Sequence, residues 1–279
     1  MTRAEAILLA ATLVLYAASF VLSLGALVGG RARLLALGRG AAALGLAAHS
    51  GALGVRWVAS GHLPVAIPYE NASAAAWFAV ALTFLAPRRW TIFRGAGAGV
   101  VALALLVLGW GATQPTAMTP MAASLRSVWL YVHVFFAFLA YGGFSIASGA
   151  ALGYVVKSAR GGTGLMVLLP PLEELDLVAY RYVVFGFITC AVMIGAGAIW
   201  AKDLWGAYWS WDPIETWNLV AWLAYGVLIH LRITYGWKGA RFAWFALVAV
   251  LLVIVAYFWV GAVFNASQHV FTVPAPPTF

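Results

Sequence analysis

The chain has very little charge for its length. Of its 279 residues only 9% are Asp, Glu, Lys or Arg, whereas 65% are hydrophobic and the mean hydropathy is +0.96. Soluble globular proteins are about 25% charged, so this composition excludes a soluble domain and indicates a protein of the lipid bilayer. The net charge of +8 is then expected in loops at one membrane face rather than on a nucleic-acid-binding surface.

Cysteine is nearly absent. The single cysteine, Cys190, lies within an apolar run, where a thiol behaves as a small hydrophobic group. Without a second thiol the chain can form neither an intramolecular disulfide nor a CxxC redox site. Any thiol that takes part in the function of this protein therefore has to come from a partner.

Long apolar runs fill most of the chain. A transmembrane helix needs about 20 mainly apolar residues, and eight stretches qualify as candidates, although the third is short. We therefore predict an all-α polytopic membrane protein with about eight transmembrane helices, the first of them retained, in a single domain of residues 1–279. The predicted spans are 5–28, 39–60, 72–86, 95–112, 127–156, 181–200, 214–235 and 242–264.

Positive charge is distributed unevenly between the loops. Twelve Lys and Arg residues lie in or beside the loops after the first, third, fifth and seventh spans, against four on the other side. Because Lys and Arg accumulate in cytoplasmic loops, both termini and the loop between the sixth and seventh spans are predicted to face outward from the cell (plasma or inner) membrane. The twelve are Arg31, Arg33, Arg39, Arg88, Arg89, Arg94, Lys157, Arg160, Arg181, Arg232, Lys238 and Arg241, and the four are Arg3, Arg56, Arg126 and Lys202.

Tryptophan gathers in one short segment, which we assign as an external Trp-rich loop over residues 200–217. Six of the 14 tryptophans fall between Trp200 and Trp222, whereas an aromatic belt would scatter them over both interfaces. Aromatic faces bind planar, mostly apolar molecules by stacking; anchoring to the membrane surface is the alternative. The candidate ligand-binding residues are Trp205, Tyr208, Trp209, Trp211, Asp212, Glu215 and Trp217.

Two acids lie at the end of this loop. Asp212 precedes Pro213, and Glu215 follows within one turn, which is the pattern of a helix N-terminus with Asp212 as the N-cap. The same carboxylates offer polar contacts to a ligand. The structural and the binding roles are compatible.

Four of the five histidines are candidates for binding metal, because imidazole is a common metal ligand. His133 and His269 are both predicted on the outer side, together with the Trp-rich loop, although an interfacial hydrogen bond or a loose tail would also explain them. His49 and His230 lie within spans, where an ionisable group is costly and indicates a function; for His49 a hydrogen bond between helices is an equal alternative. His62 is interpreted as a solvated loop residue, with ligand contact as the alternative.

Two segments resemble one known family. The run WGAYWSWDPIETWNLVAWLAYGVLIHLR, which begins at Trp205, resembles the Trp-rich WWD signature of the haem-handling proteins of cytochrome c biogenesis, and most of all the CcsA (ResC) branch of System II. The run RWVASGHLPVAIPYENAS, which begins at Arg56, is similar to an outer segment of the same branch. Ile214 departs from the pattern, because the family usually has a lysine there.

The resemblance implies a function in which haem b is both ligand and transported substrate. His133 and His269 would bind haem on the outer side, and His230 would receive it from the cytoplasmic side. The chain would be the haem-handling and exporting subunit of a holocytochrome c synthase, a haem lyase, together with a CcsB (ResB)-like membrane partner. It would present haem for thioether attachment to the CxxCH segment of apocytochrome c, and no residue is identified as a catalytic acid or base.

Two other functions stay open. A CcmC-like haem transporter or chaperone would share the Trp-rich signature without synthase activity, but the extra spans before His133 and the turn around His62 favour the CcsA branch. A membrane subunit that transfers electrons through haem b would need paired histidines at matched depths. His49 and His230 are predicted at different depths, which argues against that function.

Overall fold

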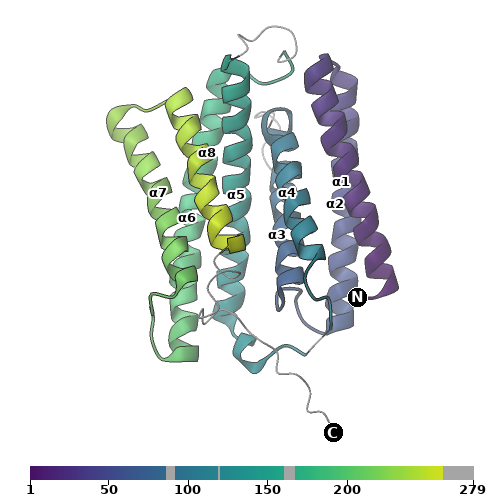
Figure 1. The fold of residues 1–279 in the computed structure, drawn as a ribbon, viewed down its shortest axis with the longest axis vertical. Coiled ribbons are helices and arrows are strands. Elements are labelled where there is room, and N and C mark those ends of the chain that lie inside the picture. Colours follow the sequence, from purple (N-terminus) through teal and green to yellow (C-terminus); the bar gives the residue numbers. More distant parts are fainter. Residues whose placement is uncertain (86–91, 119, 160–166, 260–279) are drawn as a thin grey trace.

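The computed structural model describes residues 1–85, 92–118, 120–159 and 167–259 (Figure 1). Within these ranges the structure is helical and contains no strand, which confirms the predicted all-α class. The helices are α1 (Arg3–Gly29), α2 (Ala32–Ser60), α3 (Pro68–Leu85), α4 (Ala98–Ala112), α5 (Val128–Ala159), α6 (Leu172–Trp205), α7 (Pro213–Tyr235) and α8 (Ala240–Ile254). Three short helical turns, η2 (Phe93–Gly97), η3 (Ala123–Leu125) and η5 (Val255–Trp259), precede α4, precede α5 and follow α8.

Each α-helix overlaps one of the predicted spans. Six helical segments of the described chain are long and apolar enough to cross a bilayer: α1, η2 with α4, α5, α6, α7, and α8 with η5 as far as Phe258. The other two, α2 and α3, are more polar, because α2 carries three arginines and α3 begins with an acidic first turn. The chain is therefore a multi-pass membrane protein, as predicted.

The Trp-rich segment is mostly helical, and its loop is shorter than predicted. Helix α6 continues to Trp205, where Gly206 ends it in the left-handed conformation with φ of 81°. Helix α7 begins at Pro213. Only residues 206–212 are therefore a true loop, and we call this segment the Trp loop.

The helices form two groups that lie side by side, α1–α4 and α5–α8 (Figure 1). One cluster of buried apolar residues includes Tyr16, Val80 and Val101 from the first group. A larger cluster lies mainly within the second group and includes Phe144 and Phe242. Contacts between α3 and α5 join the two groups.

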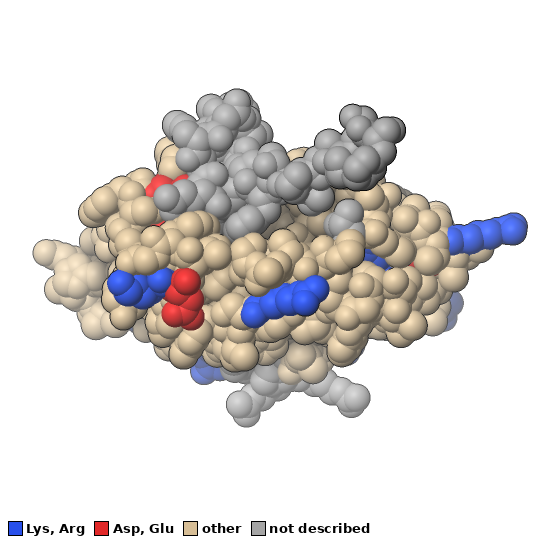
Figure 2. Space-filling model, turned by 90° about the horizontal axis from the view of Figure 1, so that it is seen from below, with Lys and Arg blue, Asp and Glu red and all other residues tan. Residues whose placement is uncertain are grey.

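One end of the bundle carries the N-terminus, the turn between α2 and α3, the segment before α5 and the Trp loop (bottom of Figure 1). The connections from α1 to α2 and from α7 to α8 lie at the opposite end. This alternation agrees with the predicted topology, and we call the first end the outer end after the predicted orientation. Seen from that end, the surface is mostly uncharged, with a few separate basic and acidic side chains (Figure 2).

Candidate functional site

The Trp loop is held by the first turn of α7. A side-chain oxygen of Asp212 accepts a hydrogen bond from the backbone N–H of Ile214 at 2.8 Å, and Pro213 is the first helical residue. The carboxylate of Glu215 accepts from the backbone N–H groups of Ser210, at 2.9 Å, and of Asp212, at 3.3 Å. The predicted capping role of Asp212 is confirmed, and Glu215 binds the loop backbone.

Trp211 has an unusual backbone conformation. Its φ of 59° is the one positive value among the non-glycine residues that the structure describes. This left-handed conformation costs a residue with a side chain about 1–2 kcal/mol. The residues on either side, Ser210 and Asp212, both donate to Glu215, so the carboxylate holds the strained turn in place. The turn leaves the indole of Trp211 69% exposed.

The other aromatic residues of the Trp-rich segment (200–217) differ in their exposure. Trp200 is buried, donates from Nε1 to the carbonyl of Ser124 at 3.2 Å, and meets Trp205 edge to face at 5.3 Å. Trp209 meets Trp211 edge to face at 5.8 Å. The segment therefore contains two edge-to-face indole pairs, one at the end of α6 and one in the Trp loop. Tyr208 is exposed, and Trp209 and Trp217 are half-buried.

His133 lies near the outer end of α5, against α6. Its Nδ1 is 2.8 Å from the carbonyl oxygen of Met193. Because a carbonyl only accepts, Nδ1 carries a proton, and the lone pair of the neutral ring is then on Nε2. Metal-binding imidazoles usually donate their other N–H to a carbonyl or carboxylate in this way. The arrangement fits an axial ligand of haem, whereas His269 falls outside the described residues.

The face of α5 that carries His133 packs toward α6 and α7. Phe144 is three turns further along and only about 20° around the helix axis from His133. Its ring stacks on Tyr225 of α7, with centroids 3.8 Å apart and planes 1° from parallel. Helix α7 leads outward from this contact to Trp217 and the Trp loop. His133 is therefore on the side of α5 that faces the helices carrying the Trp-rich segment.

His49 is enclosed by the first three helices. It is fully buried, with Nδ1 3.3 Å from the hydroxyl of Tyr16 in α1 and Nε2 3.0 Å from the hydroxyl of Ser73 in α3. Both ring nitrogens thus meet hydroxyl groups. Of the two interpretations left open by the sequence, the hydrogen bond between helices is the one that this geometry supports.

His230, in contrast to the buried His49, is exposed. It belongs to α7, where its Nδ1 lies 3.4 Å from the hydroxyl of Thr234. Val220, Leu223 and Val227 are also exposed, and their spacing of three and four residues places them with His230 on one face. A histidine on an apolar face in a membrane is costly unless a partner covers it. In the described ranges no three His, Cys, Asp or Glu side chains gather as a metal site.

A salt bridge holds the inner end of α7, next to His230. Arg232 donates to both carboxylate oxygens of Asp176 in α6, at 3.0 and 2.7 Å. Its guanidinium carbon lies 4.4 Å from the ring centroid of Tyr180 and 4.8 Å from that of Phe242. This contact joins α6, α7 and α8, so the helix that carries His230 has a fixed inner end.

A buried ionic network holds the outer end of the first group of helices, and the sequence did not predict it. Arg56 donates to Glu70 at 2.7 Å and to the carbonyl of Thr116 at 3.0 Å, and Tyr69 donates to Glu5 at 2.9 Å. Arg56, Glu70 and Glu5 are at most 2% exposed. The network fastens the turn between α2 and α3 to α1 and to the segment before α5. The available signal was an Arg and a Glu on either side of a proline-containing turn.

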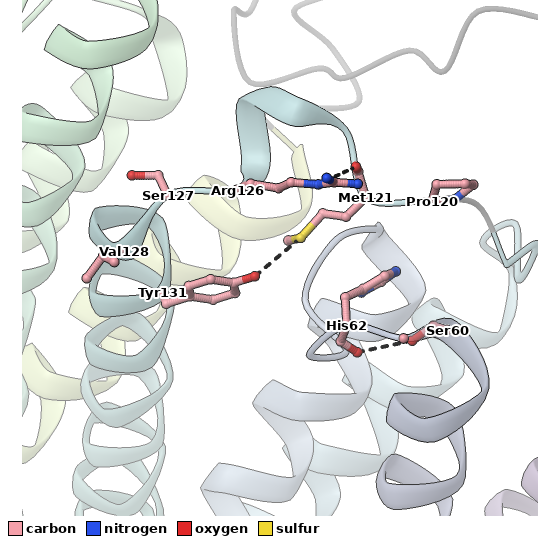
Figure 3. Close-up of a pocket in the computed structure, with 9 residues that line it drawn as sticks. Ser60, His62, Pro120, Met121, Arg126, Ser127, Val128 and Tyr131 are labelled. Carbon is pink, nitrogen blue, oxygen red and sulfur yellow. Dashed lines mark hydrogen bonds between the residues drawn. The ribbon is translucent and has the colours of Figure 1, made fainter.

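A pocket of about 590 Å³ lies at the outer end, between the turn after α2 and the start of α5 (Figure 3). His62 lines it from the turn after α2, and Arg126 and Tyr131 line it from the segment before α5 and from α5 itself. Tyr131 and His133 are two residues apart, which is about 200° around the helix. The pocket and the Met193 contact of His133 are therefore on different faces of α5.

Taken together, the bundle and the Trp loop define a multi-pass membrane protein with an aromatic surface and a hydrogen-bonded histidine at one end. A family model described as Cytochrome C assembly protein matches residues 41–266. The chain belongs to that family, which gives it a role in cytochrome c biogenesis.

Several relatives carry the CcsA name, which confirms the predicted resemblance to the CcsA branch. The chain is 33% identical over 238 residues to the cytochrome c biogenesis protein CcsA of Synechococcus sp. (strain CC9605), with 74% of this chain and 77% of the relative covered. The CcsA of Parasynechococcus marenigrum (strain WH8102) gives the same identity and coverage.

A solved structure has a similar fold. The cytochrome c haem lyase CcmF superposes with a TM-score of 0.66 and 18% identity, over 94% of this chain. This chain spans 48% of the length of CcmF. The likeness therefore concerns the fold.

Proposed function

We propose that this chain is the haem-handling and exporting subunit of a cytochrome c synthase. It would receive haem from the cytoplasmic side and present it on the outer face, where thioether bonds form with the CxxCH segment of apocytochrome c. Membership of the cytochrome c assembly family supports this proposal. The observation that carries it is the hydrogen bond from Nδ1 of His133 to the carbonyl of Met193, because it gives the imidazole the tautomer of an axial ligand.

On the outer side, His133 would be one ligand of the iron in the haem b substrate, and His269 is proposed as the other. The exposed rings of Trp211 and Tyr208 offer faces on which the macrocycle can stack. In the bond-forming step a thiol adds to a vinyl group: a carbon–sulfur bond forms and the thiol proton goes to the neighbouring vinyl carbon. This addition consumes no oxidant and no reductant. The contribution of the chain would be to orient the two reactants.

On the inner side, His230 would accept haem with the help of a second membrane protein. The histidine lies in an exposed apolar stripe with Val220, Leu223 and Val227, which is a surface that a partner helix can cover. A CcsB-like protein is the proposed partner. It would supply a second ligand and remove His230 from contact with lipid.

The test is the absorption spectrum of the chain purified with its membrane partner, for the wild type and for His133→Ala and His269→Ala. We expect both variants to lose ferrous low-spin haem bands, and added imidazole to restore them. His62→Ala is the matched control, because His62 is at the same end but lines the separate pocket. Wild-type spectra and normal cytochrome c maturation in both ligand variants would contradict the proposal.

A further inference from the structure

His133 packs against a glycine on the neighbouring helix. A Cβ added to Gly197 in α6 would lie 2.6 Å from Nδ1 and 3.0 Å from Cε1 of the imidazole. Carbon atoms in van der Waals contact are about 3.5–4.0 Å apart, so a side chain at this position would have to displace the ring. The same Nδ1 is the atom that donates to the carbonyl of Met193 at 2.8 Å.

The spacing of Met193 and Gly197 explains why a glycine is needed. In an α-helix a carbonyl accepts the N–H of the residue four positions later, which here is Gly197. Side chains tilt toward the helix N-terminus, so the Cβ of that later residue would stand beside the carbonyl. The second lone pair of the Met193 carbonyl is reached from outside the helix because Gly197 has no side chain there.

We infer that Gly197 is a positioning residue for the haem ligand His133. By leaving space beside the Met193 carbonyl it allows the hydrogen bond that fixes the tautomer and the direction of Nε2. This inference rests on the proposed function, because it gives Gly197 a role in ligation and not only in packing. The group that would move is the end of a side chain, so the hydrogen bond of His133 yields before the backbone does.

Helix α6 offers two matched controls for a Gly197→Ala variant. A Cβ at Gly195 meets no atom within 4 Å, so Gly195→Ala adds the same methyl group without a contact. A Cβ at Gly186 would lie 2.5 Å from Cε1 of Phe144, so Gly186→Ala produces a similar clash with a ring that has no ligand role. Together the two controls distinguish the effect of an added methyl group and the effect of a packing clash from the effect of a displaced ligand.

The experiment compares these three variants in the complex purified with its membrane partner. For each we would measure the haem-to-protein ratio, the ferrous low-spin bands with and without imidazole, and thermal unfolding. Gly197→Ala is expected to retain haem about 10- to 100-fold more weakly, the usual effect of losing an outer partner of a metal-binding histidine, and to regain low-spin bands with imidazole. Gly195→Ala should match the wild type. Gly186→Ala should unfold at a lower temperature, while the haem that it holds keeps wild-type bands.

A double variant isolates the role of the ring. In a His133→Ala background with added imidazole there is no tethered ring to displace, so adding Gly197→Ala should have no further effect. An equal loss of haem in that background would show that Gly197 acts by packing, and wild-type haem retention in the single Gly197→Ala variant would also overturn the inference. Unchanged spectra in His133→Ala itself would instead refute the proposed ligand, so the two failures are distinguishable.

Discussion

His49 and His133 are both histidines within long helices, yet different kinds of atom contact their ring nitrogens in the two halves of the bundle, α1–α4 and α5–α8. His49 lies among α1, α2 and α3 with one hydroxyl at each ring nitrogen, from Tyr16 and Ser73. His133 has a carbonyl, that of Met193, at Nδ1. A hydroxyl can donate or accept, so it leaves the tautomer of His49 open, whereas a carbonyl selects one tautomer. The partner atoms, and not the residue type, distinguish the proposed ligand His133 from the structural histidine His49.

The two groups of helices, α1–α4 and α5–α8, also differ in how their other functional side chains are placed. In α1–α4 the buried charged residues pair with one another, as Arg56 does with Glu70. In α5–α8 the Trp loop and α7 expose Trp211 and His230 toward opposite ends of the bundle. We interpret the first half as a closed support and the second half as the part that meets haem and the partner. Each of the following variants tests this division, from the largest expected effect on stability to the smallest.

Arg56→Ala is expected to have the largest effect on stability. It leaves the carboxylates of Glu70 and Glu5 buried without their cation, and breaking a buried ion pair costs about 3–5 kcal/mol. Thermal unfolding in detergent should show a large decrease, whereas Arg126→Ala, which removes an exposed arginine at the same end, should show almost none. If Arg56→Ala unfolded at the wild-type temperature, the interpretation of α1–α4 as a structural support would be wrong.

His49→Ala is expected to lower stability by a smaller amount. The variant removes the two hydrogen bonds to the hydroxyls of Tyr16 and Ser73, and a net contribution of about 0.5–1.5 kcal/mol for each bond gives a loss of about 1–3 kcal/mol in total. The haem spectrum of the purified complex should be unchanged. Loss of low-spin haem in this variant would break the comparison, because it would make His49 a ligand like His133.

Glu215→Ala is expected to cost about 1 kcal/mol, the usual value of a helix cap. It releases the backbone of Ser210 and Asp212, so Trp211 can leave its left-handed conformation. Haem should dissociate faster from this variant, which a transfer assay to an apo-haemoprotein would measure. Asp203→Ala, an exposed acid near the end of α6, is the control that should dissociate at the wild-type rate.

His230→Ala is expected to have the smallest effect on stability, within about 0.5 kcal/mol, because the side chain is exposed. Its effect on function should nevertheless be large, since haem would lose its inner ligand. Cytochrome c maturation in cells would measure this loss, with Lys238→Ala, an exposed residue of the connection after α7, as the control. Normal maturation in His230→Ala would contradict the inner site.

The order of the helices could be read from the chain because their signals are local. Most of the apolar runs are long enough to span, and lipid allows a lone segment to satisfy its backbone only as a helix. The cap at Asp212 and Pro213 lies within four residues of the atoms that it serves. The prediction failed at the boundary of the Trp loop, because residues 200–205 have no helix stop before Gly206.

The sequence by itself determined a multi-pass helical membrane protein, its alternating topology and the clustering of tryptophan at one loop, because length, polarity and local capping decide these. Only the tertiary structure decided which histidine meets a carbonyl, which is enclosed by hydroxyls and which is exposed. His133 and Met193 are 60 residues apart, and Arg232 and Asp176 are 56 apart. Such pairs depend on how one helix is rotated against another, and that rotation is set by side-chain packing across the whole bundle.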